Sequence, residues 1–158
     1  MSSNISQPSQ ISSETSKFIF VETRGDLFND APADSSLAHC VSADFKMSKG
    51  IAKIFKKLYG TRGLSDQHKK VGQVATLPDN NRYIFYIITK KIYSQKPTKE
   101  DFESAINDLR KVCEEKNVKL LCLPRIGTGL DKLPLEYVHR TIRQVFDGHE
   151  MKMIMFYL

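Results

Sequence analysis

Hydrophobic residues along the chain form short continuous runs that alternate with stretches of helical periodicity. Apolar, β-rich runs at residues 18–23, 37–42, 73–77, 82–89, 118–123 and 151–157 have the length and composition of strands. Apolar side chains spaced three and four apart predict helices over residues 50–60, 98–116 and 135–146. Residues 61–72 suit either a loop or a short helical piece, and the pattern does not decide between them.

Local signals mark where several of these elements begin and end. Thr98 and Asp101 resemble a capping box in which Asp replaces the usual Glu or Gln, so a helix begins there. Gly60 supplies a C-terminal cap for the preceding helix. Residues 78–81, Pro-Asp-Asn-Asn, predict a hairpin turn between two neighbouring strands.

The order of these elements predicts an α/β fold. A helix that links two apolar strands is a crossover, so the strand ending near Lys90 should run parallel to the strand at residues 118–123. We expect three layers, α/β/α, around a mixed, mostly parallel sheet of about six strands. The Ser-rich residues 1–16 should form a flexible tail, and residues 17–158 one domain.

In such sheets ligands bind outside the carboxyl ends of the strands. Polar or flexible groups follow the predicted strands at Asp26, Ser42, Lys90, residues 125–131 and Leu158. If these strands are parallel, all of these groups lie along one edge of the sheet.

A loop with two glycines, Gly127 and Gly129, follows the apolar strand at residues 118–123. Gly127 and Gly129 can adopt positive φ and have no Cβ, so backbone N–H groups there can turn toward a bound anion. Pro134 and Glu136 then suit the start of a helix, whose N-terminus also attracts anions. The loop is therefore a candidate phosphate site. A tight turn without any ligand has the same sequence signature.

Charge and cysteine content narrow the class of protein. Lys and Arg outnumber Asp and Glu by 24 to 18, giving a net charge of +6 that favours an anionic partner. The lysines are scattered without a nucleic-acid motif, so direct nucleic-acid binding is the weaker interpretation. No stretch is apolar enough for a membrane span or a signal peptide, and we expect a soluble intracellular protein.

Four further residues have both a structural and a chemical interpretation. Cys40, Cys113 and Cys122 lack paired spacing, which predicts reduced core residues in place of disulfides or a zinc site. His39 lies inside an apolar run, where a hydrogen-bonded core histidine and a catalytic one are both possible. We expect neither a metal nor a cofactor.

The chain resembles a known family in several segments that occur in one order. These are Gly25-Asp26-Leu27-Phe28, Leu37-Ala38-His39-Cys40, Ile88-Thr89-Lys90-Lys91 and Pro124-Arg125-Ile126-Gly127-Thr128-Gly129-Leu130-Asp131. Together they are similar to the macrodomain family, whose members bind ADP-ribose. The resemblance covers nearly all of residues 17–158.

The resemblance implies roles for particular residues. Asp26 and Leu27 would hold the adenine end of the ligand, Ser42 would line the ribose side, and Leu158 would close over the cleft. The pyrophosphate and distal ribose would be wrapped by Arg125, Ile126, Gly127, Thr128, Gly129 and Leu130. Lys90 would be the nucleophile and Asp131 its acid/base partner. Most macrodomains have an Asn-Ala-Ala-Asn type segment where this chain has residues 39–42, so the lysine route is favoured.

The resemblance also implies a reaction and partners. An amine in its neutral form can displace a carboxylate from the anomeric carbon of ribose and pass through a Schiff base that water hydrolyses. The expected activity is removal of ADP-ribose from glutamate and aspartate side chains, together with deacetylation of O-acetyl-ADP-ribose. The expected partners are ADP-ribose, ADP-ribosylated proteins and poly(ADP-ribose). The protein is expected to be a monomer in the nucleus or cytoplasm. A reader that binds ADP-ribose without turnover is the alternative.

Overall fold

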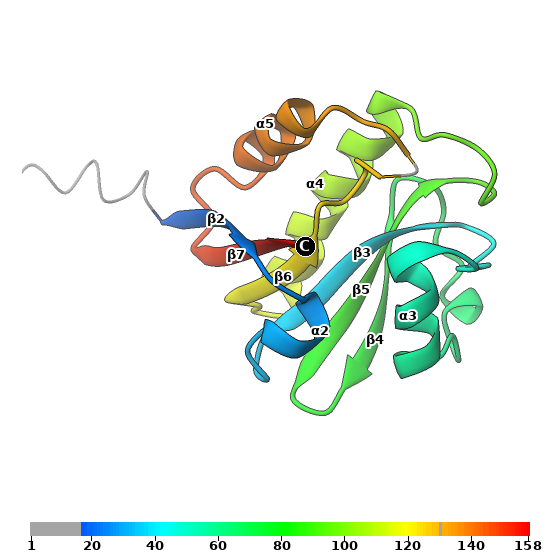
Figure 1. The fold of residues 1–158 in the computed structure, drawn as a ribbon, viewed down its shortest axis with the longest axis horizontal. Coiled ribbons are helices and arrows are strands. Elements are labelled where there is room, and N and C mark those ends of the chain that lie inside the picture. Colours follow the sequence, from blue (N-terminus) through cyan, green and yellow to red (C-terminus); the bar gives the residue numbers. More distant parts are fainter. Residues whose placement is uncertain (1–16, 130) are drawn as a thin grey trace, which may run out of the picture.

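A single mixed sheet forms the centre of the molecule (Figure 1). The computed structural model describes residues 17–129 and 131–158. The described strands are β2 (Phe18–Arg24), β3 (Ser36–Ser42), β4 (Val74–Asp79), β5 (Arg82–Lys90), β6 (Leu120–Pro124) and β7 (Met151–Tyr157). They form a six-stranded sheet in the order β2-β7-β6-β3-β5-β4.

All neighbouring strands in this sheet are parallel except the pair β4 and β5 at one edge. The predicted parallel relation between the strand ending at Lys90 and the strand after the next helix is confirmed. These two strands are not neighbours, because β3 lies between them and pairs with both. The carboxyl ends of β2, β3, β5, β6 and β7 therefore meet at one edge of the sheet.

Helices cover both faces of the sheet, which confirms the predicted three-layer arrangement (Figure 1). The long helix α4 (Lys99–Glu115) and α5 (Leu135–Val145) pack on one face. The helices α2 (Leu27–Asp30) and α3 (Gly50–Tyr59) contribute to the other. None of the helices in the described part of the chain has the length and hydropathy needed to span a bilayer.

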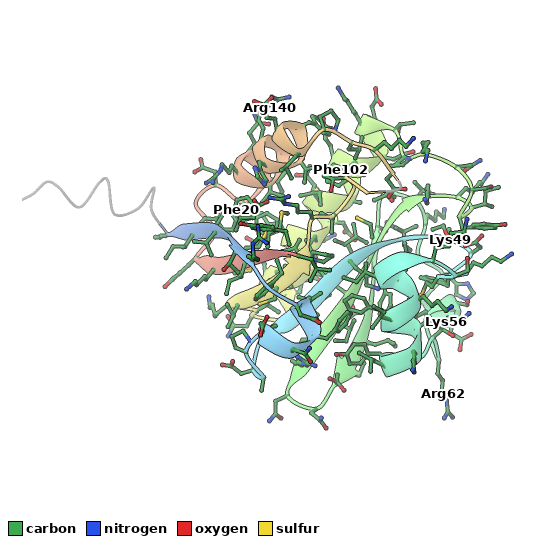
Figure 2. The ribbon with its side chains drawn as sticks, viewed as in Figure 1. Phe20, Lys49, Lys56, Arg62, Phe102 and Arg140 are labelled. Atoms are coloured by element: carbon green, nitrogen blue, oxygen red, sulfur yellow. The ribbon has the colours of Figure 1, made fainter. Side chains whose placement is uncertain are left out.

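The central strands read as continuous apolar runs because both of their faces are buried. In β5, Phe85 and Ile87 belong to the cluster under α4 and α5, whereas Ile84 and Tyr86 belong to the cluster under α3. Figure 2 shows Phe102 of α4 inside the molecule, while the exposed Lys56 and Arg62 project outward.

Most predicted element ends agree with the structure. Gly60 caps α3 with φ 73°, and the Thr98 side chain accepts a hydrogen bond of 3.0 Å from the Asp101 backbone N–H at the start of α4. The hairpin turn is shorter than predicted, because Pro78 and Asp79 pair with Tyr83 and Arg82 within the ladder. Pro78 is tolerated there because β4 is an edge strand.

Two local features were not anticipated, and one undecided segment contains the short helical piece that was one of its two alternatives. Residues after Gly25 form the short helix α2, which begins where the Asp26 side chain accepts from the Phe28 backbone N–H. The undecided segment at residues 61–72 contains a 3₁₀ turn, Ser65–Gln67. In α3 only Phe55 is buried, whereas Ile54 and Leu58 are 45% and 53% exposed, because the short helix contacts the sheet along a narrow line.

His39 is a core residue, as one of the two interpretations has it, but its ring is not hydrogen-bonded to any described residue. The ring is fully buried, stacks on Phe55 with centroids 3.8 Å apart, and meets the edge of Tyr86. Neither ring nitrogen has a hydrogen-bond partner among the described residues. Burial away from water lowers the pKa of His39 from an ordinary value of 6.5 to about 3.

The neutral state of His39 predicts a specific dependence of stability on pH. Between pH 6.5 and about 3 the unfolded chain takes up a proton at this residue and the folded protein does not. The free energy of unfolding should therefore fall by up to about 1.4 kcal/mol per pH unit below pH 6.5 because of His39 alone. Urea unfolding at several pH values should show a shallower slope for His39→Phe.

The exposed His68 provides the control, since its left-handed backbone conformation (φ 53°) also suits asparagine. His68→Asn should retain the parent slope. An unchanged slope in His39→Phe would contradict the assignment of a neutral buried His39.

Candidate functional site

A cavity of about 560 Å³ opens at the carboxyl edge of the sheet. Its walls come from the end of β3, the start of α3, the β5–α4 loop and the glycine loop after β6. A volume of this size is ordinary for a small-molecule site. Among the predicted site residues, the lining includes Ser42, Lys90, Arg125, Ile126, Gly127, Gly129 and Asp131.

An ion pair between Lys90 and Asp131 lies in this cavity. Lys90 Nζ donates to Asp131 Oδ1 at 2.6 Å, and the two side chains are only 14% and 13% exposed. Ser42 is the register partner of Lys90, and the next residue donates its backbone N–H to the Lys90 carbonyl at 2.8 Å. The sheet therefore brings a hydroxyl, an ammonium and a carboxylate to one wall.

The two glycines of the loop have different structural roles. Gly127 has φ 74°, as expected, and a Cβ there would lie 3.0 Å from Leu133 and 3.3 Å from Phe102. Gly129 does not adopt positive φ, and a Cβ there would meet no atom of the described residues within 4 Å. Gly127 thus shapes the turn, whereas Gly129 leaves open space at the cavity wall.

A cluster of Glu22, Arg125 and His139 anchors the start of the loop. Arg125 donates to both carboxylate oxygens of Glu22, at 2.7 and 3.1 Å, and His139 Nε2 lies 2.8 Å from the same carboxylate. The hydrogen bond from Arg125 holds the pKa of Glu22 below its ordinary value. The Arg125 guanidinium also lies over the Tyr157 ring, 4.2 Å from its centroid. These contacts tie the loop to β2, α5 and the end of β7.

The pairing in this cluster was missed in the sequence, because Glu22 and Arg125 are 103 positions apart and Glu22 belongs to no local motif. The helix end at the cavity was also assigned to the wrong helix. The lining includes the start of α3, from Ser48 to Ala52, and no residue of α5. Lys49 at the N-cap of α3 makes no side-chain cap bond, so the positive end of this helix dipole opens on the cavity.

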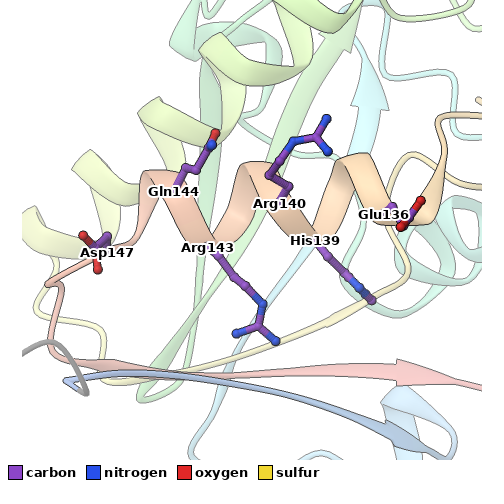
Figure 3. Close-up of a pocket in the computed structure, with 6 residues that line it drawn as sticks. All are labelled: Glu136, His139, Arg140, Arg143, Gln144 and Asp147. Atoms are coloured by element: carbon purple, nitrogen blue, oxygen red, sulfur yellow. The ribbon is translucent and has the colours of Figure 1, made fainter.

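A second hollow, of about 640 Å³, lies along α5 and is lined by side chains of that helix and by Asp147 (Figure 3). Its lining includes His139, Arg143 and Arg140. Figure 3 shows His139 and Arg143 directed toward the strands and Arg140 directed away from them. His139 contacts Glu22, Arg143 lies over Phe20 and Arg140 over Tyr137. None of the predicted site residues lines this hollow.

Comparison with known proteins identifies the family. The family model described as "Macro domain" matches residues 38–142. A human protein named ADP-ribose glycohydrolase OARD1 is 42% identical over 146 residues, which are 92% of this chain and 94% of that protein. The chain belongs to the macrodomain family.

Solved macrodomain structures share this fold at low sequence identity. The macrodomain of Thermus aquaticus DarG superposes with a TM-score of 0.78 at 23% identity, over 89% of this chain and 99% of that one. Thermosipho africanus DarTG, solved in complex with ADP-ribose, gives a TM-score of 0.72 at 18% identity, over 87% of this chain and 42% of that one.

Other predicted site residues of this macrodomain lie outside the cavity lining. Asp26 caps α2, and Leu27 is buried against the sheet. Thr128 donates its hydroxyl to the Arg125 carbonyl at 2.8 Å, and Leu158 is 91% exposed at the chain end. Leu130 lies outside the described residues, as does the predicted tail at residues 1–16.

The three cysteines are free thiols. Cys113 and Cys122 are buried and Cys40 is half-buried at the cavity. Burial raises the pKa of the Cys40 thiol, and the nearby Asp131 charge raises it further, so the thiol is protonated. Within residues 17–129 and 131–158 no cluster of three or more His, Cys, Asp or Glu residues could hold a metal ion.

The contrast between the two loop glycines is testable. Gly127→Ala should lower the free energy of unfolding by about 1–3 kcal/mol, because it strains a positive-φ position and crowds Leu133. Gly129→Ala should change it by less than about 0.5 kcal/mol. Urea denaturation measures both. Equal destabilisation by the two substitutions would argue against this loop geometry.

Proposed function

We propose that this macrodomain binds ADP-ribose in the carboxyl-edge cavity and hydrolyses esters that join ADP-ribose to glutamate and aspartate side chains. The observation that carries the proposal is the Lys90–Asp131 pair, 2.6 Å apart and largely buried in that cavity. The name of the human relative, an ADP-ribose glycohydrolase, supports a hydrolase over a simple binding module.

The charge of the cavity suits a pyrophosphate. The uncapped start of α3 presents the positive end of its dipole, and the backbone of the glycine loop can approach a ligand closely at Gly129. The Arg125 guanidinium is paired with Glu22, so we assign phosphate contacts to the loop backbone and not to this side chain. Lys90 and Ser42 then mark the end of the cavity for the distal ribose.

The Lys90–Asp131 ion pair also determines the order of the chemical steps. An ammonium group has no lone pair, so Lys90 cannot attack while it donates to Asp131 in the ion pair. We infer that a ribose hydroxyl of the bound substrate donates to the Asp131 carboxylate in place of Lys90, and that the Lys90 ammonium then gives a proton to water. The amine that results is the nucleophile.

The reaction then proceeds in two steps. The lone pair of Lys90 Nζ attacks the anomeric carbon, the bond from that carbon to the carboxylate oxygen breaks, and the substrate carboxylate departs with the bonding electrons. After loss of a proton from nitrogen and ring opening, the adduct is a Schiff base. Water adds to the same carbon and releases ADP-ribose and the free lysine. Asp131 is placed to transfer the protons between these groups.

Acetate is also a carboxylate leaving group, so O-acetyl-ADP-ribose with its acetyl group on the anomeric oxygen falls within the same chemistry. A macrodomain that only reads ADP-ribose needs the cavity but not a positioned amine and carboxylate. Turnover is therefore the measurement that separates the two functions.

The ligand assignment predicts an order of affinities. ADP-ribose should bind at least about tenfold more tightly than AMP, because AMP lacks the second phosphate and the distal ribose. Calorimetry measures both. Gly129→Glu should abolish binding through bulk and like charge, Gly129→Gln should weaken it less, and Gly129→Ala should retain it. Equal affinity for ADP-ribose and adenosine would exclude the phosphate assignment.

The mechanism predicts a separation of turnover from binding. Lys90→Ala should lose at least about 10²-fold in kcat on a glutamate-ADP-ribosylated protein, while the affinity for ADP-ribose changes far less. Asp131→Ala should lose turnover as well. Borohydride added during turnover should trap the Schiff base on Lys90, as detected by mass spectrometry.

The exposed neighbour Lys91, outside the cavity lining, is the matched control, and Lys91→Ala should keep full activity. A fully active Lys90→Ala would rule out the lysine mechanism. A parent protein that binds ADP-ribose but never releases it from the modified target would leave the reader function in its place.

A further inference from the structure

Asp44 is not itself in the cavity lining, but it receives three hydrogen bonds, two of them from the lining residues Ser42 and Tyr93. The Ser42 hydroxyl donates to its Oδ1 at 2.5 Å, and the Lys46 backbone N–H donates to the same oxygen at 3.1 Å. Its Oδ2 accepts from the Tyr93 backbone N–H at 3.3 Å. One carboxylate thus joins the end of β3 to the β5–α4 loop, both of which line the cavity.

The protonation state of Asp44 decides the direction of the Ser42 bond. Partial burial opposes ionisation, but the Ser42 hydroxyl and the two backbone N–H groups lower the pKa of this carboxyl below its ordinary value. An ionised carboxylate can only accept hydrogen bonds. The single hydroxyl hydrogen of Ser42 is therefore committed to Asp44.

The hydrogen bond from Ser42 to Asp44 limits which groups of a ligand Ser42 can bind. Ser42 is 4% exposed and lines the cavity, next to Lys90 in the strand register. With its hydrogen on Asp44, its oxygen presents only lone pairs to a ligand. A hydroxyl group of the ligand can donate to it, whereas a phosphate or carboxylate oxygen would be repelled.

We propose that Asp44 is a positioning residue that makes Ser42 an acceptor-only contact and thereby selects a hydrogen-bond-donating ribose hydroxyl at the Lys90 end of the cavity. The inference rests on the proposed function, since the ligand is taken to be ADP-ribose. It assigns Asp44 a role in specificity through Ser42 and no direct part in bond cleavage.

The test compares ADP-ribose with ADP, which lacks the distal ribose, by calorimetry. In the parent, ADP-ribose should bind more tightly than ADP. Ser42→Ala and Asp44→Ala should each reduce this preference about fivefold to tenfold, the effect of one lost hydrogen bond. The double variant Ser42→Ala/Asp44→Ala should lose no more than either single one, because Asp44 acts through Ser42.

Lys46→Ala is the control that removes the side-chain contact between Lys46 and Tyr93. Its ammonium lies over the Tyr93 ring, 4.4 Å from the centroid, and its backbone N–H to Asp44 is kept in the variant. Lys46→Ala should keep the preference for ADP-ribose over ADP. Additive losses in the double variant, or a loss in Lys46→Ala equal to that in Asp44→Ala, would overturn the proposal.

A second measurement does not depend on the folding of an Asp44 variant. Fluorine in place of each distal ribose hydroxyl in turn removes the donor at nearly constant size. One such analogue should bind the parent more weakly than ADP-ribose, and that penalty should vanish in Ser42→Ala. If every analogue binds the parent as tightly as ADP-ribose, the acceptor-only assignment is wrong. If the parent binds no ADP-ribose at all, the proposed function itself fails.

Discussion

Parallel pairing of the strands is the constraint on which the site depends. A parallel strand can only be reached by a crossover, so successive strands return to the same starting edge and end at the same opposite edge. Because β3 is inserted between β5 and β6, the groups that follow these three strands become neighbours. Ser42, Lys90 and the glycine loop meet for this reason, although long stretches of chain separate them.

Carboxylates at this edge are each satisfied by particular donors. Glu22 is held by Arg125 and His139, and Asp131 by Lys90. Asp44 is held by a hydroxyl and two backbone N–H groups. An anionic ligand would be repelled by unpaired carboxylates, so this pairing matters for the cavity as a whole. It also orients the loop, the hydroxyl and the lysine before any ligand arrives.

Much of the fold and part of the site could be predicted from local sequence. Both faces of the central strands are buried, so their apolar runs are unmistakable, and Thr98 and Gly60 mark helix ends through local hydrogen bonding and backbone freedom. Resemblance to a family pointed to Lys90 and Asp131, and the structure brings them together. The positive φ of Gly127 followed from its place in the loop.

What the sequence determined by itself was the set of strands and the three longer helices, because backbone preference and burial pattern are local properties. Only the tertiary structure decided which side chains meet across them. The pairing of Glu22 with Arg125, the unsatisfied ring of His39 and the helix end at the cavity all depend on strand order and helix placement. Those are set by packing between residues far apart in the chain, and no local pattern records them.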